Sequence, residues 1–352
     1  MKIFLETHNL SNRFTGFGQF NFNLLKAMSK CDLTGLEITI STVRSKDLKA
    51  ELGNIFNYST YKSITRYKFF RPRKKYDLWH SVNQNIKTEP RHNLPYLLTV
   101  HDVNFIEEKS GKQLADLKKR FEQKLNRSNA IVYISKFAKE MTHKYFTVPK
   151  VPELIIYNGS PEMPKLPEAF QPQTIPQKPF LFTIGGLIPK KNFHVLIEMM
   201  NYLPDYSLVI AGKESTPYAT EVKELIKKYK LGDRIYLPGK ISEDDKYYYY
   251  ENCSAFVFPS LREGFGIPPI EAMKKGKPVI AANSSSIPEV CGSHAFYWDH
   301  FEASYMSDLV KKALEQYALN QESLSQNYKE HADSYSWKKA AEQYLDLYRS
   351  FS

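Results

Sequence analysis

Pro259-Ser-Leu-Arg-Glu-Gly-Phe-Gly-Ile-Pro-Pro-Ile-Glu-Ala-Met273 lies between two apolar runs, residues 255–258 and 278–282, that have the composition of buried strands. The stretch predicts a strand, a glycine loop and a short helix, because its paired prolines suit a helix start. Glycines let a backbone approach a ligand closely, and the free amides of a helix start attract an anion. We expect Glu263, before the loop, and Glu271, in the first helical turn, to flank one ligand. The alternative is a tight connection followed by a glutamate that only the helix dipole favours.

Strand-like and helix-like runs alternate along both halves of the chain. The two halves are separated by residues 160–179, which contain six prolines and have the character of a linker. A repeated order of strand and helix implies parallel sheets that are covered by helices. We therefore predict an α/β fold with two domains, residues 1–165 and 166–335, which enclose a cleft.

The composition is that of a packed globular protein, with 42% hydrophobic and 14% aromatic residues among 352. No apolar run reaches the roughly 18 residues that a membrane span needs, and the first residues read as a strand rather than a secretory signal. The three cysteines contain no C-x-x-C pair, and the nine histidines have no zinc-ligand spacing. We expect reduced thiols, no metal site and a cytoplasmic location.

The net charge of +11 predicts an anionic partner. The charge is concentrated in residues 62–75, where Tyr67, Phe69 and Phe70 stand among the cations. Such a segment can place aromatic rings in a bilayer interface while its cations meet anionic lipids. A solvated basic loop is the alternative. We expect no nucleic-acid partner, because no recognised binding module accompanies the charge.

The run from Glu263 to Glu271 resembles the E-x7-E signature of the retaining nucleotide-sugar glycosyltransferases of family 4, and residues 277–282 and 285–292 extend the likeness. The resemblance implies the GT-B fold, in which two Rossmann-like parallel-sheet domains face each other across a cleft. It also implies that the C-terminal helix, within residues 336–352, crosses back onto the first domain.

The resemblance assigns roles to individual side chains. His101 would approach the hydroxyls of the donor sugar, Lys191 would neutralise the leaving diphosphate, and Glu263 would lie beside the transferred sugar. Glu271 would accept hydrogen bonds from the ribose. The other donor-binding residues that the resemblance implies are Gly16, Gly18, Gly186, Lys190, Arg262, Gly264, Phe265, Gly266 and Ile267.

One position departs from the family pattern. Many relatives carry an arginine where this chain has Gly186, and that arginine makes a second phosphate contact. Lys190 or Arg262 would have to supply the missing contact. Without it, the donor loses a charge-assisted hydrogen bond of roughly 1.5 to 3 kcal/mol.

The function implied by the resemblance is transfer of a hexose from a nucleotide sugar to a growing bacterial surface polysaccharide or a lipid-linked oligosaccharide. Residues 285–290 resemble mannosyltransferases, which favours GDP-mannose as the donor and leaves UDP-hexoses open. The D-x-D metal clamp of other glycosyltransferases is absent, so we expect a metal-independent enzyme without a cofactor. We expect it in the cytoplasm, or peripherally on the inner face of the cytoplasmic membrane.

Two other functions remain open at this point. One is a nucleotide-sugar epimerase of the same fold, which would isomerise the donor without an acceptor. The other is a non-catalytic nucleotide- or glycan-binding subunit, which the missing arginine at Gly186 suggests. A two-carboxylate hydrolase is disfavoured, because the resemblance places Glu271 at the ribose and a hydrolase leaves the positive phosphate site unexplained.

Overall fold

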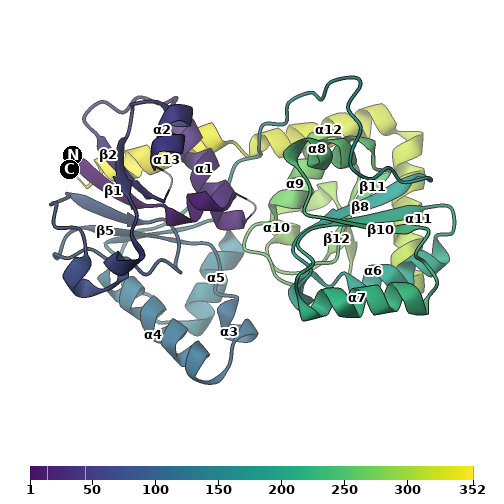
Figure 1. Cartoon of the computed structure of the whole chain (residues 1–352), viewed down its shortest axis with the longest axis horizontal. Helices are drawn as coiled ribbons and strands as arrows, with labels where there is room; N and C mark the ends of the chain where they lie inside the picture. The colour runs from purple at the N-terminus through teal and green to yellow at the C-terminus, as the bar shows by residue number, and fades with distance from the viewer. Residues whose placement is uncertain (14, 44, 352) are drawn as a thin grey trace. The chain divides into compact units, whose positions relative to one another are not determined.

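The computed structural model describes residues 1–13, 15–43 and 45–351, and the chain divides into two compact units (Figure 1). The N-terminal unit comprises Met1–Gly159 and Tyr335–Ser352, and the C-terminal unit comprises Ser160–Ser334. In this division residues 160–165, the start of the proline-rich segment, belong to the C-terminal unit.

The N-terminal unit is built on a seven-stranded parallel sheet, as far as its described residues show, in the order β3-β2-β1-β4-β5-β6-β7. Its strands are β1 (Lys2–Glu6), β2 (Glu37–Thr42), β3 (Asn57–Thr60), β4 (Leu78–Ser81), β5 (Tyr96–Val100), β6 (Ala130–Tyr133) and β7 (Glu153–Ile155). Strands β4, β5 and β6 are buried along their whole length, as expected of strands that helices cover on both faces.

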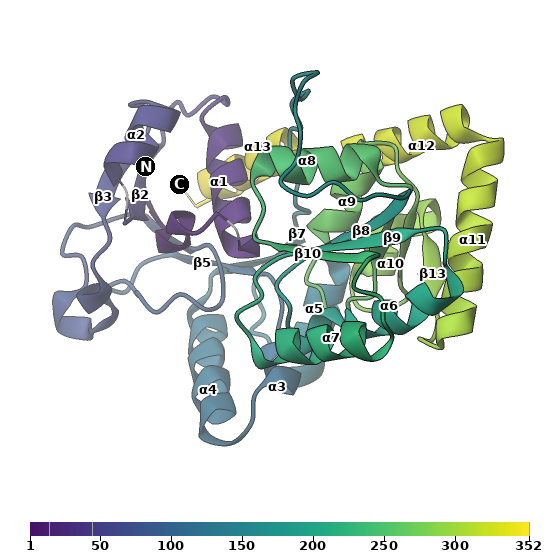
Figure 2. The ribbon, with the colours of Figure 1, turned by 45° about the vertical axis from the view of Figure 1, so that its right-hand side comes forward.

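Helices cover both faces of this sheet. The α-helices are α1 (Gly16–Met28), α2 (Ser45–Leu52), α3 (Phe105–Glu108), α4 (Gly111–Arg127), α5 (Lys136–Tyr145) and α13 (Trp337–Arg349). Short 3-10 turns are η1 (His8–Ser11), η2 (Ser63–Arg66) and η3 (Lys68–Phe70). Helices α1 and α13 lie on one face and α4 and α5 on the other (Figures 1 and 2).

The C-terminal unit, whose residues 160–334 are all described, contains a six-stranded parallel sheet in the order β10-β9-β8-β11-β12-β13. The strands are β8 (Phe180–Ile184), β9 (Ser207–Ala211), β10 (Ile235–Gly239), β11 (Ala255–Phe258), β12 (Val279–Ala282) and β13 (Phe296–Trp298). The helices are η4 (Pro189–Lys191), α6 (His194–Met199), η5 (Met200–Tyr202), α7 (Pro217–Lys228), α8 (Glu243–Asn252), α9 (Ile267–Lys274), α10 (Ile287–Cys291), η6 (Gly292–His294), α11 (Ala303–Leu319) and α12 (Gln321–Ser334). Helices α8 and α9 lie on one face, and α6 and α7 on the other (Figure 2).

The last helix, α13, packs on α1 within the N-terminal unit. Its apolar stripe includes Tyr344 and Tyr348, both fully buried. The Tyr348 hydroxyl lies 2.7 Å from Nδ1 of His80, and the Tyr344 hydroxyl lies 3.1 Å from Oγ1 of Thr99. Buried polar groups need such partners, so this network holds α13 against β4 and β5.

The strand order places ligand-binding edges in both units. In open parallel sheets, ligands bind beyond the carboxyl ends of the strands, where the chain order reverses. The reversals lie between β1 and β4 in the N-terminal unit and between β8 and β11 in the C-terminal unit. In the part of the chain that the structure describes, no helix combines the length and apolar character needed to cross a bilayer.

Candidate active site

The main candidate site lies where β8 and β11 end side by side in the C-terminal unit. The loop after β8 carries Gly185 and Gly186 and runs into η4, and the loop after β11 carries Ser260 to Gly266. The amide of Leu261 donates to the carbonyl of Lys190 at 2.9 Å, which joins the two loops. The predicted residues Lys190, Lys191, Arg262 and Glu263 therefore come together at the predicted edge of the sheet.

Lys191 and Glu263 form an ion pair. Nζ of Lys191 donates to Oε1 of Glu263 at 2.5 Å, and the Ser260 hydroxyl donates to the same oxygen at 2.7 Å. The side chains are 13% and 16% exposed, so solvent and a ligand can reach both. Nζ also lies 4.9 Å from the centre of the Phe258 ring. A diphosphate that binds here would compete with Glu263 for the ammonium group.

Two serines outside the predicted site hold the glycine loop in place. The amide of Glu263 donates to the Ser285 hydroxyl at 3.0 Å. The Ser286 hydroxyl faces the carbonyls of Glu263 and Phe265 at 3.0 and 2.9 Å. Both serines lie in the run that extends the family likeness, but the sequence alone did not indicate that their hydroxyls bond to the backbone of the glycine loop.

The glycine loop ends in a left-handed residue. Gly266 has φ of 99° and is the N-cap of α9, where a side chain would be strained. Ile267 begins the helix and prolines follow it, as predicted for this stretch. Phe265 is 3% exposed, so its ring belongs to the core and only its backbone is placed for a ligand.

Glu271 is the fifth residue of α9, so the prediction that it stands in the first helical turn is wrong. The helix begins earlier than the prolines suggested, and the dipole alone does not account for this carboxylate. Its partners come from α8: Nζ of Lys246 donates to Oε1 at 3.0 Å and the Tyr250 hydroxyl donates to Oε2 at 2.7 Å. Glu271 is 6% exposed.

The sequence alone did not identify Lys246 and Tyr250 as partners of Glu271. They stand four residues apart on α8, a spacing that puts both on one face of a helix. Burial alone lowers the pKa of the Lys246 ammonium, but the carboxylates of Glu271 and Glu243 together raise it above its usual range. Lys246 is therefore a buried cation, and each oxygen of the Glu271 carboxylate keeps capacity for a second hydrogen bond.

Gly186 has open space around it. A Cβ placed there would have no atom within 4 Å, and the residue has no left-handed conformation that requires glycine. Gly212, by contrast, has φ of 152°, and a Cβ there would lie 1.7 Å from the carbonyl oxygen of Gly185. The strand-end loop thus depends on Gly212 for its close backbone contact, whereas position 186 could accommodate a side chain.

In the N-terminal unit, His101 lies just beyond β5 and is 6% exposed. Its Nε2 is 2.9 Å from the carbonyl oxygen of Val82, and its ring meets Phe17 and Phe20 edge-on at 4.9 and 4.5 Å. Burial lowers the pKa of the imidazole to about 4, although the Val82 carbonyl opposes the shift. The neutral ring donates through Nε2, which leaves Nδ1 as an acceptor.

The glycine loop at residues 15–19 lies against this histidine through Phe17. Gly16 begins α1 and has open space, while a Cβ on Gly18 would lie 2.0 Å from the carbonyl oxygen of Asn12. Packing within the loop therefore requires the second glycine. Gly16, Gly18 and His101 share one region of the N-terminal unit, and the other predicted site residues belong to the C-terminal unit.

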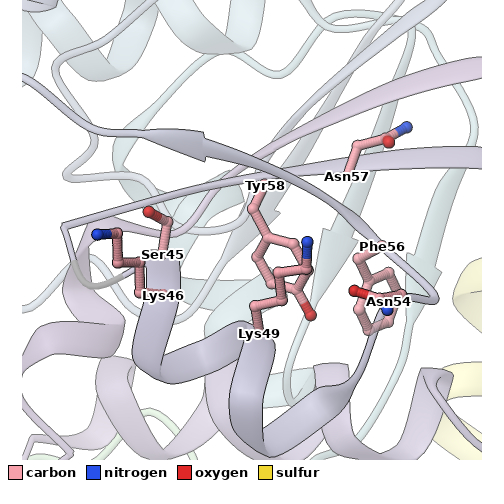
Figure 3. Close-up of a pocket in the computed structure, with 7 residues that line it drawn as sticks. All are labelled: Ser45, Lys46, Lys49, Asn54, Phe56, Asn57 and Tyr58. Atoms are coloured by element: carbon pink, nitrogen blue, oxygen red, sulfur yellow. The ribbon is translucent and has the colours of Figure 1, made fainter.

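A hollow of about 480 Å³ lies elsewhere in the N-terminal unit, between α2 and β3 (Figure 3). Lys46 and Lys49 extend from α2 on one side, and Tyr58 comes from β3. None of the predicted site residues lines it. Across residues 1–13, 15–43 and 45–351, no group of three or more His, Cys, Asp or Glu side chains is placed to hold a metal ion.

Comparisons with known proteins add to this geometry. The model of the family described as "Glycosyl transferases group 1" matches residues 166–333. The chain is 23% identical over 382 residues to O-antigen chain mannosyltransferase B of Escherichia coli, a match covering 99% of this chain and 100% of that protein. It is 27% identical over 221 residues to O-antigen chain mannosyltransferase RfbU of Salmonella typhimurium, covering 61% of each.

Solved structures share the fold. Anabaena HepE in complex with UDP-glucose superposes with a TM-score of 0.76 at 17% identity, over 99% of each chain. Sucrose-phosphate synthase from Thermosynechococcus elongatus has a TM-score of 0.75 at 18% identity, over 99% of this chain and 98% of that one. These likenesses and the two parallel sheets confirm the prediction of two Rossmann-like domains of the GT-B type.

Proposed function

Because residues 166–333 match the family described as "Glycosyl transferases group 1" and the whole chain resembles an O-antigen mannosyltransferase, we propose that it is a retaining transferase that moves a hexose from a nucleotide sugar to a saccharide acceptor. The preferred donor is GDP-mannose, which the mannosyltransferase relatives support, and the UDP-glucose complex of HepE keeps UDP-hexoses as the second choice. The acceptor is a growing surface polysaccharide or a lipid-linked oligosaccharide, in line with the O-antigen relatives.

The observation that carries the proposal is the pairing of Lys191 with Glu263 at the strand reversal of the C-terminal unit. A hydrolase would place two carboxylates around the sugar, whereas here a cation and a carboxylate share a site beside a glycine loop. The cation suits the diphosphate of the donor, and the carboxylate suits the sugar that is transferred. When the diphosphate draws Lys191 away, the Glu263 oxygen becomes available to the sugar.

The chemistry follows from charge. Breaking the bond between the sugar and the diphosphate develops negative charge on the leaving oxygen and positive character on the sugar ring. Lys191, with Lys190 and Arg262 nearby, stabilises the leaving group, and the loop amides at residues 264–267 add dipoles. We propose that these protein groups, rather than a metal ion, neutralise the diphosphate. The acceptor hydroxyl oxygen bonds to the anomeric carbon on the face from which the diphosphate leaves, and the leaving phosphate accepts its proton, so the configuration is retained.

In the same proposal Glu271 binds the ribose hydroxyls, and His101 receives a hydroxyl of the donor sugar at Nδ1. Lys246 and Tyr250 hold the Glu271 carboxylate in one orientation. This arrangement needs no titration of His101 near neutral pH, because its pKa of about 4 keeps the ring neutral.

The test is transfer from a nucleotide sugar to an acceptor, followed by detection of both products. Lys191→Ala and Glu263→Gln should each lower the turnover roughly 100-fold or more, as loss of one transition-state contact does at other sites. Lys311→Ala removes an exposed cation on α11 that pairs with Asp308 and is the matched control. Unchanged turnover in both site variants would refute the assignment.

The same assay separates the other functions. An epimerase would convert the donor into its isomer without an acceptor. A non-catalytic subunit would bind the donor, seen as a rise in melting temperature, and release no nucleoside diphosphate. Either result would replace the transferase proposal.

We also propose that the protein binds an anionic membrane surface through residues 62–75. This segment contains seven Lys and Arg residues and no Asp or Glu. In the structure its apolar side chains face solvent: Phe69 is 69% exposed, Tyr67 57% and Phe70 49%. Exposed rings among cations are the pattern of an interfacial anchor, in which rings enter the headgroup region and cations attract anionic lipid.

Vesicle flotation tests the membrane proposal. The protein should bind phosphatidylglycerol vesicles at low salt, and replacing Phe69 and Phe70 together by Ser should weaken binding roughly tenfold or more. Leu319→Ser, at an 81% exposed position on α11, is the control for a lost surface apolar group. Absence of binding at low salt, where screening is weakest, would refute the proposal.

A further inference from the structure

A carboxylate, an imidazole and a phenol come together at the carboxyl edge of the N-terminal sheet, outside the residues discussed above. Glu6 is the last residue of β1 and is 0% exposed. His8 follows in η1, and its Nδ1 lies 2.9 Å from both carboxylate oxygens of Glu6. Tyr61 follows β3, two strands away in the sheet, and stacks on the His8 ring at 4.6 Å with 18° between the planes.

Each partner restricts His8. The Glu6 carboxylate accepts the Nδ1 proton, which directs the Nε2 atom away from the pair. The Tyr61 ring sets the plane of the imidazole. The His8 side chain is 30% exposed, whereas its carboxylate partner is fully buried. One ring nitrogen is thus held in a set direction on a side chain that a ligand can reach.

The position is that of a ligand site. Strand β1 flanks the reversal of strand order, beyond which ligands bind in open parallel sheets. The pair is anchored there, because the Thr7 amide and hydroxyl both bond to the carbonyl of Ser41 at 3.0 Å. A buried carboxylate is costly unless it is paired, and here the partner that it orients is a partly exposed imidazole.

We propose that Glu6, His8 and Tyr61 form a binding subsite for a saccharide hydroxyl of the acceptor, with His8 as the residue in contact. This assignment rests on the proposed transferase function. A sugar hydroxyl bonds to the outward Nε2, as donor to the neutral ring or as acceptor from the protonated ring. Glu6 and Tyr61 act as positioning residues, since they set the tautomer and the plane of His8.

The test uses methyl α-D-mannopyranoside as the probe, with saturation-transfer NMR titrations on the full chain. The wild-type protein should bind it saturably, and His8→Ala should bind it roughly tenfold more weakly or worse, the loss expected for one strong hydrogen bond. Glu6→Gln should weaken binding in the same direction, because the amide no longer enforces one tautomer. Circular dichroism checks that each variant is folded.

The matched control is His300→Ala, because His300 stacks on Tyr305 at 4.0 Å and 22° on the surface of the C-terminal unit. It should bind the probe like the wild type. Absence of saturable binding to the wild type, or equal binding to His8→Ala, would overturn the subsite.

Kinetics distinguish this inference from the proposed function. The His8→Ala variant should show a raised KM for the acceptor, with the KM for the nucleotide sugar unchanged. An unchanged acceptor KM would overturn the subsite while transfer itself stands. Absence of transfer by the wild type with every nucleotide sugar would instead overturn the proposed function.

Discussion

Replacing Lys246 by Met should destabilise the C-terminal unit, because it leaves the Glu271 carboxylate buried without its cation. Lys246 is 7% exposed and Glu271 6%, and their charged atoms are 3.0 Å apart. Removing one partner of such a pair costs about 3 to 5 kcal/mol. The contact of Lys246 with Glu243 adds little, because the Glu243 side chain is half exposed and screened by solvent. Because the Glu271 carboxylate keeps its hydrogen bond from the Tyr250 hydroxyl, we expect a loss of stability at the lower end of this range, about 3 kcal/mol.

Urea denaturation of the full chain, followed by circular dichroism, measures this cost. With a slope of roughly 2 kcal/mol per molar, the midpoint of the affected transition should fall by about 1.5 M. The double variant Lys246→Met with Glu271→Gln removes both charges and should be more stable than Lys246→Met alone. A midpoint of Lys246→Met within about 0.3 M of the wild type would refute the buried pair. So would a double variant whose loss of stability equals the sum of the losses in the two single variants.

Three further changes test other parts of the structure. Gly186→Arg should tighten nucleotide-sugar binding several-fold in a thermal-shift titration, because the position is open and lies beside the proposed phosphate site; weaker binding would count against that placement. Gly212→Ala should lower the melting temperature and abolish donor binding, since its Cβ would meet the Gly185 carbonyl; a wild-type melting curve would contradict the close contact. The pKa of His80 is lowered to about 3 from 6.5 by burial and by His101, so the unfolded chain binds the proton first as the pH falls. The free energy of unfolding should therefore decline below about pH 6.5. In His80→Gln its slope against pH, measured by urea titrations between pH 4 and 6, should be smaller by about 1.4 kcal/mol per pH unit. An equal slope in the variant and the wild type would refute the neutral buried state of His80.

The sequence predicted the strand, loop and helix around residues 259–273 because glycine and proline mark such boundaries locally. It also predicted β11, and β5 and β8 are short apolar runs of the same kind. The edge strands β3 and β13 are harder to predict from the sequence. Each has only three or four residues and is partly exposed, so neither shows a clear hydrophobic pattern.

The support for the candidate site was less visible. Lys246 and Tyr250 reach Glu271 across the packing of α8 on α9, and no pattern within either helix reveals which faces meet. The four consecutive tyrosines at residues 247–250 do not reveal it either, although Tyr249 and Tyr250 are fully buried and both hydroxyls are bonded. Glu6 and His8 escaped notice because they look like the polar end of an ordinary strand.

The roles of the glycines were likewise only partly predictable from the sequence. Gly266 was expected to permit a sharp turn, and its φ of 99° agrees. Gly18 stays a predicted donor-binding residue, and in the structure it also packs against the carbonyl of Asn12. A sequence shows that a glycine is present but not which neighbour requires it.

Retaining sugar transfer is tested most directly by the product that the purified chain forms from a nucleotide sugar and a saccharide acceptor. GDP-mannose and UDP-hexoses should be incubated in turn with methyl α-D-mannopyranoside, and the new glycosidic bond examined by NMR. A retaining transferase should form one disaccharide whose anomeric configuration matches that of the donor, and Lys191→Ala should not form it. An inverted linkage, an isomerised donor without transfer, or full product from Lys191→Ala would contradict this prediction.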